Sequence, residues 1–179
     1  SSGKNFSPDL VILNYFINDA ELTPKRKSNF FSERSYAYVF FMGRWDLLKR
    51  KFVGGDPWDS YYRNLYSDEA GGWARTKASI RHLTKLCKSS NINLILVNYP
   101  ELHNLNNYPF KTVNKKLKLL SSDLNLPYLD LFPFVKGLNE SELWVSTSDL
   151  HPNGKANILY ANAIKDFLFD IFDSISRKK

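Results

Sequence analysis

Residues 148–154 read Ser-Asp-Leu-His-Pro-Asn-Gly, which places Asp149 two residues before His151. Pro152 has a fixed φ, and the Asn-Gly pair that follows it is typical of a turn or of the beginning of a helix. Apolar residues then recur at helical spacing: Ile158, Leu159, Ile164, Phe167, Leu168, Ile171, Phe172 and Ile175. Asp149 and His151 are therefore expected on a tight connection that leads into a final helix.

The Asp149/His151 pattern has two interpretations. A carboxylate beside an imidazole can hold the ring in one tautomer and stabilise the imidazolium, which is what a general base requires. Asp-x-His is also short and common, and a loop histidine that bonds only to the backbone is equally compatible with it. The pattern alone leaves both interpretations open.

The rest of the chain predicts an α/β fold with a parallel sheet. Short apolar runs predict strands at three places: 10–13, 92–97 and 126–132. The first run is apolar throughout, which is typical of a strand buried on both faces. Amphipathic or aromatic-rich patterns predict helices around these strands: 32–48, 73–89 and 111–124. Residues 135–148 are expected to form a loop. The alternation of strands with helices is the signature of a parallel sheet.

Polar residues follow each predicted strand. Asn18 and Asp19 come after the first strand, residues 99–103 after the second, and Asp149 with His151 after the third. Right-handed crossovers place the carboxyl ends of parallel strands at one edge, where open α/β sheets bind ligands. We therefore expect these groups to converge. The alternative for Asn18 or Asp19 is a turn or a helix cap.

Length and composition indicate one domain over residues 1–179, with 43% hydrophobic and 15% aromatic residues to form a core. The net charge of +7 comes from scattered lysines and arginines without an interleaved aromatic stripe, so a solvated basic surface is favoured over nucleic-acid binding.

Cys87 is the single cysteine and is expected to be a buried structural thiol. No apolar run is long enough for a transmembrane segment. The three histidines show no metal-ligand spacing, so neither a metal nor a cofactor is expected.

Two blocks of the chain resemble the SGNH (GDSL-type) hydrolases. Pro8-Asp9-Leu10-Val11-Ile12-Leu13, followed by Asn18-Asp19, looks like the third block of that family. Ser148-Asp149-Leu150-His151-Pro152-Asn153 resembles the fifth block in its Asp-x-His-Pro-Asn form. The resemblance implies a three-layer α/β/α sandwich with a parallel sheet, the flavodoxin-like SGNH hydrolase fold. It also implies a serine esterase or acyl hydrolase, in which water or a sugar hydroxyl accepts the acyl group.

The resemblance assigns a role to each matching residue. His151 corresponds to the general base, Asp149 to its orienting carboxylate and Asn18 to the oxyanion-hole donor. Asp19, Tyr15 and Tyr99 are expected to bind the substrate, a small-molecule, lipid or carbohydrate ester. The aromatic residues near the site suit stacking on a sugar or contact with an acyl chain, although core packing is the more frequent role of such residues.

Two features depart from the family pattern. The glycine that usually precedes Asn-Asp in the third block is absent, because Asn14 and Phe16 occupy this region. The Gly-Asp-Ser block that carries the nucleophile and the block with an oxyanion glycine also have no counterpart. The N-terminal strands are therefore expected to be missing from this chain, and the serine to lie upstream in the same protein. A catalytically inactive domain that binds a glycan or an acyl group is the alternative.

Overall fold

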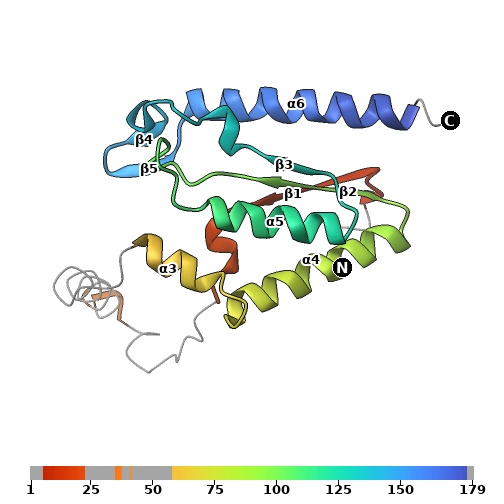
Figure 1. Ribbon diagram of the computed structural model, residues 1–179, viewed down its shortest axis with the longest axis horizontal. Helices are drawn as coiled ribbons and strands as arrows, with labels where there is room; N and C mark the ends of the chain where they lie inside the picture. Colours follow the sequence, from red (N-terminus) through yellow and green to blue (C-terminus); the bar gives the residue numbers. More distant parts are fainter. Residues whose placement is uncertain (1–5, 23–34, 38–40, 42–57, 177–179) are drawn as a thin grey trace.

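A computed structural model of the chain describes residues 6–22, 35–37, 41 and 58–176 (Figure 1). The helix predicted over 32–48 lies largely outside these residues. The described part is a mixed α/β structure whose helices and parallel strands alternate along the chain.

Three strands form a parallel sheet in the order β1-β2-β3. They are β1 (Leu10–Tyr15), β2 (Asn93–Asn98) and β3 (Tyr128–Asp130). Leu10 pairs with Asn93 at the beginning of β1, and Leu96 pairs with Tyr128 at the beginning of β3. The predicted α/β fold with a parallel sheet is confirmed, and all three strands end at the same edge.

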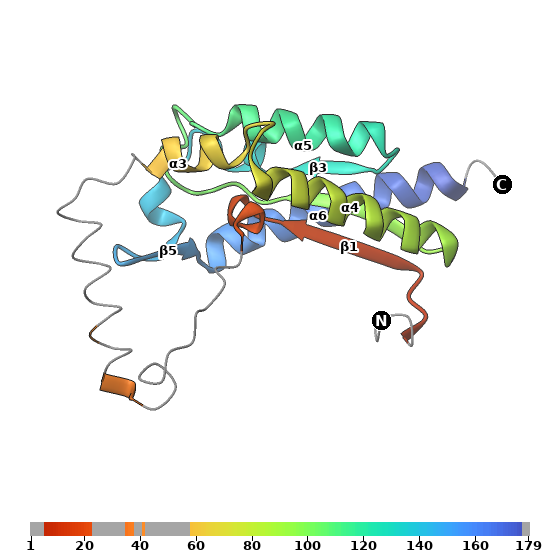
Figure 2. The same ribbon diagram turned by 90° about the horizontal axis from the view of Figure 1, so that it is seen from below.

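Helices cover both faces of this sheet. The crossover from β1 to β2 contains α3 (Trp58–Leu65) and α4 (Gly71–Ser89), and that from β2 to β3 contains α5 (Lys111–Asp123). Successive right-handed crossovers in one direction place their helices on the same face. Figures 1 and 2 show α4 and α5 on one side of the sheet and α6 (Gly154–Ser176) on the other. None of the described helices has the length and apolarity to cross a membrane.

The core is centred on β2, whose residues Leu94–Val97 are buried from both sides. Cys87 of α4 is buried against this core, as predicted. The prediction that the run 10–13 is buried on both faces is wrong, because Ile12 is 37% exposed. In the described sheet β1 is an edge strand that pairs only with β2, so part of its surface remains accessible.

The segment predicted as a loop over 135–148 contains regular structure. A short 3₁₀ helix, η4 (Glu140–Glu142), leads into β4 (Trp144–Ser146), which pairs antiparallel with β5 (Asp149–Pro152). Asp149 and His151 therefore stand on a strand of a small hairpin. The helix that they were expected to precede, α6, begins directly after β5.

Candidate active site at the carboxyl ends of the strands

Asp149 and His151 form the hydrogen-bonded pair that their spacing predicts. The carboxylate oxygen Oδ1 of Asp149 accepts from Nδ1 of His151 at 2.6 Å and from the backbone N–H of His151 at 3.2 Å. Since a carboxylate only accepts, Nδ1 carries the proton, and Nε2 is left to accept one. These bonds from the His151 ring and backbone lower the pKa of Asp149. The His151 side chain is 84% exposed, so its ring is available to a ligand.

Asn153 fixes the hairpin to the helix that follows it. Its Nδ2 donates to the backbone carbonyls of Glu142 at 2.8 Å and Trp144 at 3.0 Å. Trp144 pairs with Pro152, which has no N–H to donate, so the Asn153 amide supplies a donor there. Its Oδ1 accepts from the backbone N–H of Ala156 at 3.1 Å, which caps the first turn of α6. The asparagine of the Asp-x-His-Pro-Asn block thus has a structural role that is independent of catalysis.

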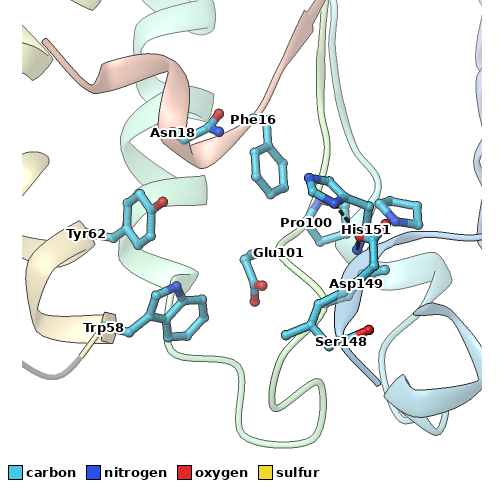
Figure 3. A pocket seen from close by; sticks show the side chains of 12 residues that line it. Phe16, Asn18, Trp58, Tyr62, Pro100, Glu101, Ser148, Asp149 and His151 are labelled. Carbon is cyan, nitrogen blue, oxygen red and sulfur yellow. Dashed lines mark hydrogen bonds and ion pairs between the residues drawn. The ribbon is translucent and has the colours of Figure 1, made fainter. Parts of the chain in front are cut away.

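A pocket of about 270 Å³ lies beside this hairpin. It is lined from four segments: Phe16 and Asn18 after β1, Trp58 and Tyr62 of α3, Pro100–Leu102 after β2, and Ser148–Pro152 around β5. Figure 3 shows Asn18, Tyr62 and Trp58 across the pocket from Asp149 and His151. Asn18, Asp149 and His151 therefore line one pocket at the carboxyl ends of the strands, which confirms their expected positions.

Asn18 is positioned by a short 3₁₀ helix, η2 (Ile17–Ala20), directly after β1. The carboxylate of Asp19 accepts from the backbone N–H of Phe16 at 2.8 Å, which caps this helix. Ile17 and Ala20 are buried, so η2 is anchored to the core while Asn18 remains exposed at the pocket.

The three residues expected to bind substrate lie outside this pocket, and each has a structural contact instead. Asp19 is the cap just described. Tyr15 is only 3% exposed, and its hydroxyl lies 2.5 Å from that of Tyr66. Burial raises the pKa of Tyr15 to about 12. Tyr99 packs edge-on against Tyr160 with ring centroids 5.3 Å apart. Core packing therefore accounts for both tyrosines.

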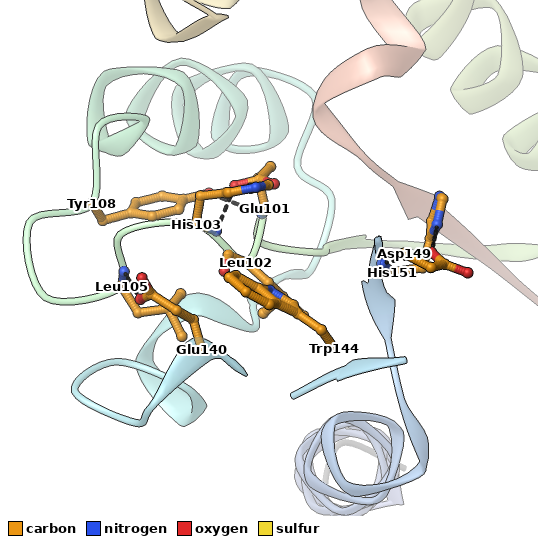
Figure 4. Close-up of polar contacts among 9 residues, drawn as sticks. All are labelled: Glu101, Leu102, His103, Leu105, Tyr108, Glu140, Trp144, Asp149 and His151. Carbon is orange, nitrogen blue, oxygen red and sulfur yellow. Dashed lines mark hydrogen bonds and ion pairs between the residues drawn. The ribbon is translucent and has the colours of Figure 1, made fainter. Parts of the chain in front are cut away.

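A second acid–histidine pair stands on the loop after β2 (Figure 4). Glu101-Leu102-His103 repeats the acid-Leu-His order of residues 149–151. The Glu101 carboxylate accepts from the backbone N–H of His103 at 2.7 Å and also contacts Nδ1 of its ring. Glu101 is only 7% exposed, and burial raises its pKa while the His103 backbone and ring oppose that rise. Of this pair only the acid lines the pocket, whereas both Asp149 and His151 line it.

Trp58 and Tyr62 were not predicted to line the site, and Glu101 was expected there only as a member of the polar segment 99–103, although each has a signal in the sequence. Glu101 shares the acid-Leu-His pattern with the predicted dyad. Trp58 and Tyr62 stand four residues apart, which places both rings on one face of a helix. Residues 53–60, which include Trp58, were interpreted as a break after the preceding helix because of the nearby Gly54-Gly55 and Pro57.

The described residues contain neither a serine bonded to His151 nor a metal-binding cluster. Ser148 lines the pocket, but its hydroxyl lies 3.1 Å from that of Ser146. Within the described part of the chain, no three histidine, cysteine, aspartate or glutamate side chains come together to hold a metal ion. The arrangement therefore offers a base, a carboxylate that orients it and an amide donor facing one pocket.

The chain matches no protein-family model and no curated protein. The interpretation of the pocket therefore depends on its own residues and on the two sequence blocks.

Proposed function

We propose that the chain is an SGNH/GDSL-type ester hydrolase domain, with His151 as general base, Asp149 as its orienting carboxylate and Asn18 as oxyanion donor. The observation that carries the proposal is that the hydrogen-bonded Asp149–His151 pair and the Asn18 amide face one pocket at the carboxyl ends of parallel strands. This is the edge at which open α/β sheets bind their ligands.

In the proposed reaction, Nε2 of His151 takes the proton from a serine hydroxyl as its oxygen attacks the ester carbonyl. Asp149 stabilises the imidazolium that results. The Asn18 amide donates to the oxyanion of the tetrahedral intermediate. The intermediate collapses to an acyl-enzyme, and His151 returns the proton to the departing alcohol. Water then hydrolyses the acyl-enzyme, or a sugar hydroxyl takes the acyl group.

The nucleophilic serine is proposed to come from outside the described residues, from chain upstream of this segment. Ser148 is not favoured as the nucleophile, because its hydroxyl contacts that of Ser146 and has no hydrogen bond to the His151 ring. Ser148 also lies directly before β5, the strand that carries His151. The edge position of β1 is compatible with further strands beside it.

A second candidate function is a catalytically inactive domain that binds a glycan or an acyl group in the same pocket. The specific observation in its favour is that no serine of the described residues is hydrogen-bonded to His151. In that case the Asp149–His151 pair would contribute only to the structure of the hairpin.

The decisive experiment is labelling by a serine-directed fluorophosphonate, using the natural protein with any residues encoded before Ser1. We expect labelling and a burst of product from an activated acyl ester, both lost in His151→Ala. His82→Ala is the matched control, because His82 is exposed on α4 and does not line the pocket. Equal labelling of both variants would rule out His151 as the base.

The same probe locates the nucleophile. We expect no labelling of the 179-residue chain by itself. Labelling of any serine in this chain that disappears in His151→Ala would show that the nucleophile lies within it.

A further inference from the structure

We propose that Trp58, Tyr62 and Glu101 form a subsite for a neutral, polyhydroxylated ring, that is, a sugar, across the pocket from His151. That this sugar is the alcohol half of an ester rests on the proposed function above. The binding itself requires no catalysis and can be tested separately.

The aromatic part of this subsite comes from one helix. Trp58 and Tyr62 lie one turn apart on α3, with ring centroids 6.0 Å apart and planes at 83°. The Trp58 ring also packs against Phe110 at 4.9 Å and His103 at 4.8 Å. These contacts hold the indole in place, yet 40% of Trp58 remains exposed beside the pocket. A rigid aromatic surface of this kind offers a large apolar contact at a small loss of conformational entropy.

Glu101 supplies the polar part. In Figure 3 its side chain lies between the Trp58–Tyr62 wall and the Asp149–His151 pair. An ionised carboxylate has about four lone-pair sites, of which His103 uses two through its backbone and ring, and the backbone of Leu102 acts on the same carboxylate. A remaining site can accept a hydrogen bond from a ligand hydroxyl. His103 is itself held between the rings of Trp58 and Trp144, so Glu101 has a fixed orientation.

The charges around the pocket distinguish a sugar from other small ligands. Among the described residues no lysine or arginine lines the pocket, although the chain has a net charge of +7, so the described lining does not favour a phosphate or carboxylate ligand. The carboxylates of Glu101 and Asp149 are each hydrogen-bonded to a histidine ring, and the described residues bring no three metal-ligating side chains together to hold a metal ion. The buried Glu101 carboxylate also disfavours an acyl group as ligand, because the hydrocarbon would displace water from the carboxylate without replacing the hydrogen bonds that the water makes.

A ring with apolar C–H faces and hydroxyl edges satisfies both parts at once. One face of the sugar lies on the Trp58 ring and its edge meets Tyr62, which stands nearly perpendicular to that ring, while its hydroxyls donate to Glu101. The volume of about 270 Å³ is just below the range of about 300–1,000 Å³ typical of ligand pockets, so it suits a single ring. From this position a sugar ester would extend toward His151 and Asn18.

The test is saturation-transfer NMR and calorimetric titration of the full chain with tetrasaccharides of β-glucose, xylose and N-acetylglucosamine, alongside choline and hexanoate. We expect at least one saccharide to bind through its ring C–H groups, and its affinity to fall at least about tenfold in Trp58→Ala and in Glu101→Ala. Tyr61→Ala is the matched control, because Tyr61 lies on α3 but does not line the pocket; this variant should bind normally. If Trp58→Ala does not fold, Trp58→Phe and Glu101→Gln should still show intermediate losses.

The outcomes separate the two proposals. Binding of none of the saccharides, a Trp58-dependent binding of choline or hexanoate alone, or equal losses in Trp58→Ala and Tyr61→Ala would overturn the subsite. His151→Ala should retain saccharide binding and lose ester turnover. Saccharide binding without ester turnover in the natural protein would refute the hydrolase proposal and support the sugar subsite. Turnover of a small activated ester without saccharide binding would support the hydrolase proposal and refute the sugar subsite.

Discussion

Gly72 is the position where a single added methyl group should disturb both the fold and the proposed site. It lies in the first turn of α4, where this helix packs against η2. A Cβ at this position would lie 2.2 Å from the backbone oxygen of Ala20 and 2.8 Å from Cδ1 of Leu65. The Leu65 side chain can rotate away, but the Ala20 oxygen belongs to the backbone and can move only with η2 itself.

The size of the effect follows from these distances. Relieving the contact with the Ala20 oxygen requires a shift of roughly 1 Å, and overpacking of this kind costs about 1–3 kcal/mol of stability. Alanine is favoured over glycine in a helix by about 0.5–1 kcal/mol, which offsets part of that loss. We therefore expect Gly72→Ala to be destabilised by about 1–2 kcal/mol. Because η2 also carries Asn18, ester turnover should fall as well.

Urea unfolding followed by circular dichroism measures the first effect, with Gly71→Ala as the matched control. A Cβ at Gly71 would lie 3.8 Å from Cδ1 of Leu22, which is an ordinary contact. Gly71→Ala should therefore be as stable as the natural chain or more stable. A Gly72→Ala variant as stable as the natural chain would contradict the close packing of α4 against η2.

Three further predictions concern the loops of the site. Asn153→Ala should lower the free energy of unfolding by about 2–4 kcal/mol, because it removes a helix cap and two hydrogen bonds, whereas Asn153→Ser should keep the cap and lose less. Asn18→Ala should reduce turnover about 10²–10³-fold without altering urea unfolding; lower stability with unchanged turnover would instead make Asn18 a cap. Since the pKa of Asp149 is lowered, the stabilisation from its pair with His151 is present above about pH 4 and lost as the pH falls through that lowered pKa. His151→Ala should raise the pKa toward its ordinary value, as measured by carboxyl ¹³C NMR, and an unchanged pKa would contradict the pairing.

The helices and strands were largely predictable because their signals are local. The apolar spacing over 73–89 and 111–124 corresponds to α4 and α5, the run 92–97 covers all of β2 except its last residue, and the run 126–132 contains β3. The hairpin at 144–152 was not predicted, since a strand of three or four residues is too short to show alternation. Its position depends on the hydrogen bonds from Asn153 and on the bond that Nε1 of Trp144 donates to the carbonyl of Leu102 in the loop after β2.

The Asp149–His151 pair was predictable for the same reason. Both bonds to the carboxylate join residues two positions apart, so the backbone of β5 is enough to form them. The substrate residues were not predictable in this way. Tyr15 and Phe16 are adjacent in the sequence, yet Tyr15 is buried in the core and Phe16 lines the pocket, because successive side chains point to opposite sides.

The sequence by itself determined the parallel α/β class, the expected edge for a ligand site, and the Asp149–His151 geometry, because each arises from contacts within one segment or from the handedness of crossovers. Only the tertiary structure decided that Trp58 and Glu101 face His151 across one pocket. These residues come from three segments separated by more than 40 positions, and their meeting depends on how α3, the loop after β2 and the hairpin pack on the common core. Such packing results from many long-range contacts together, which no local spacing records.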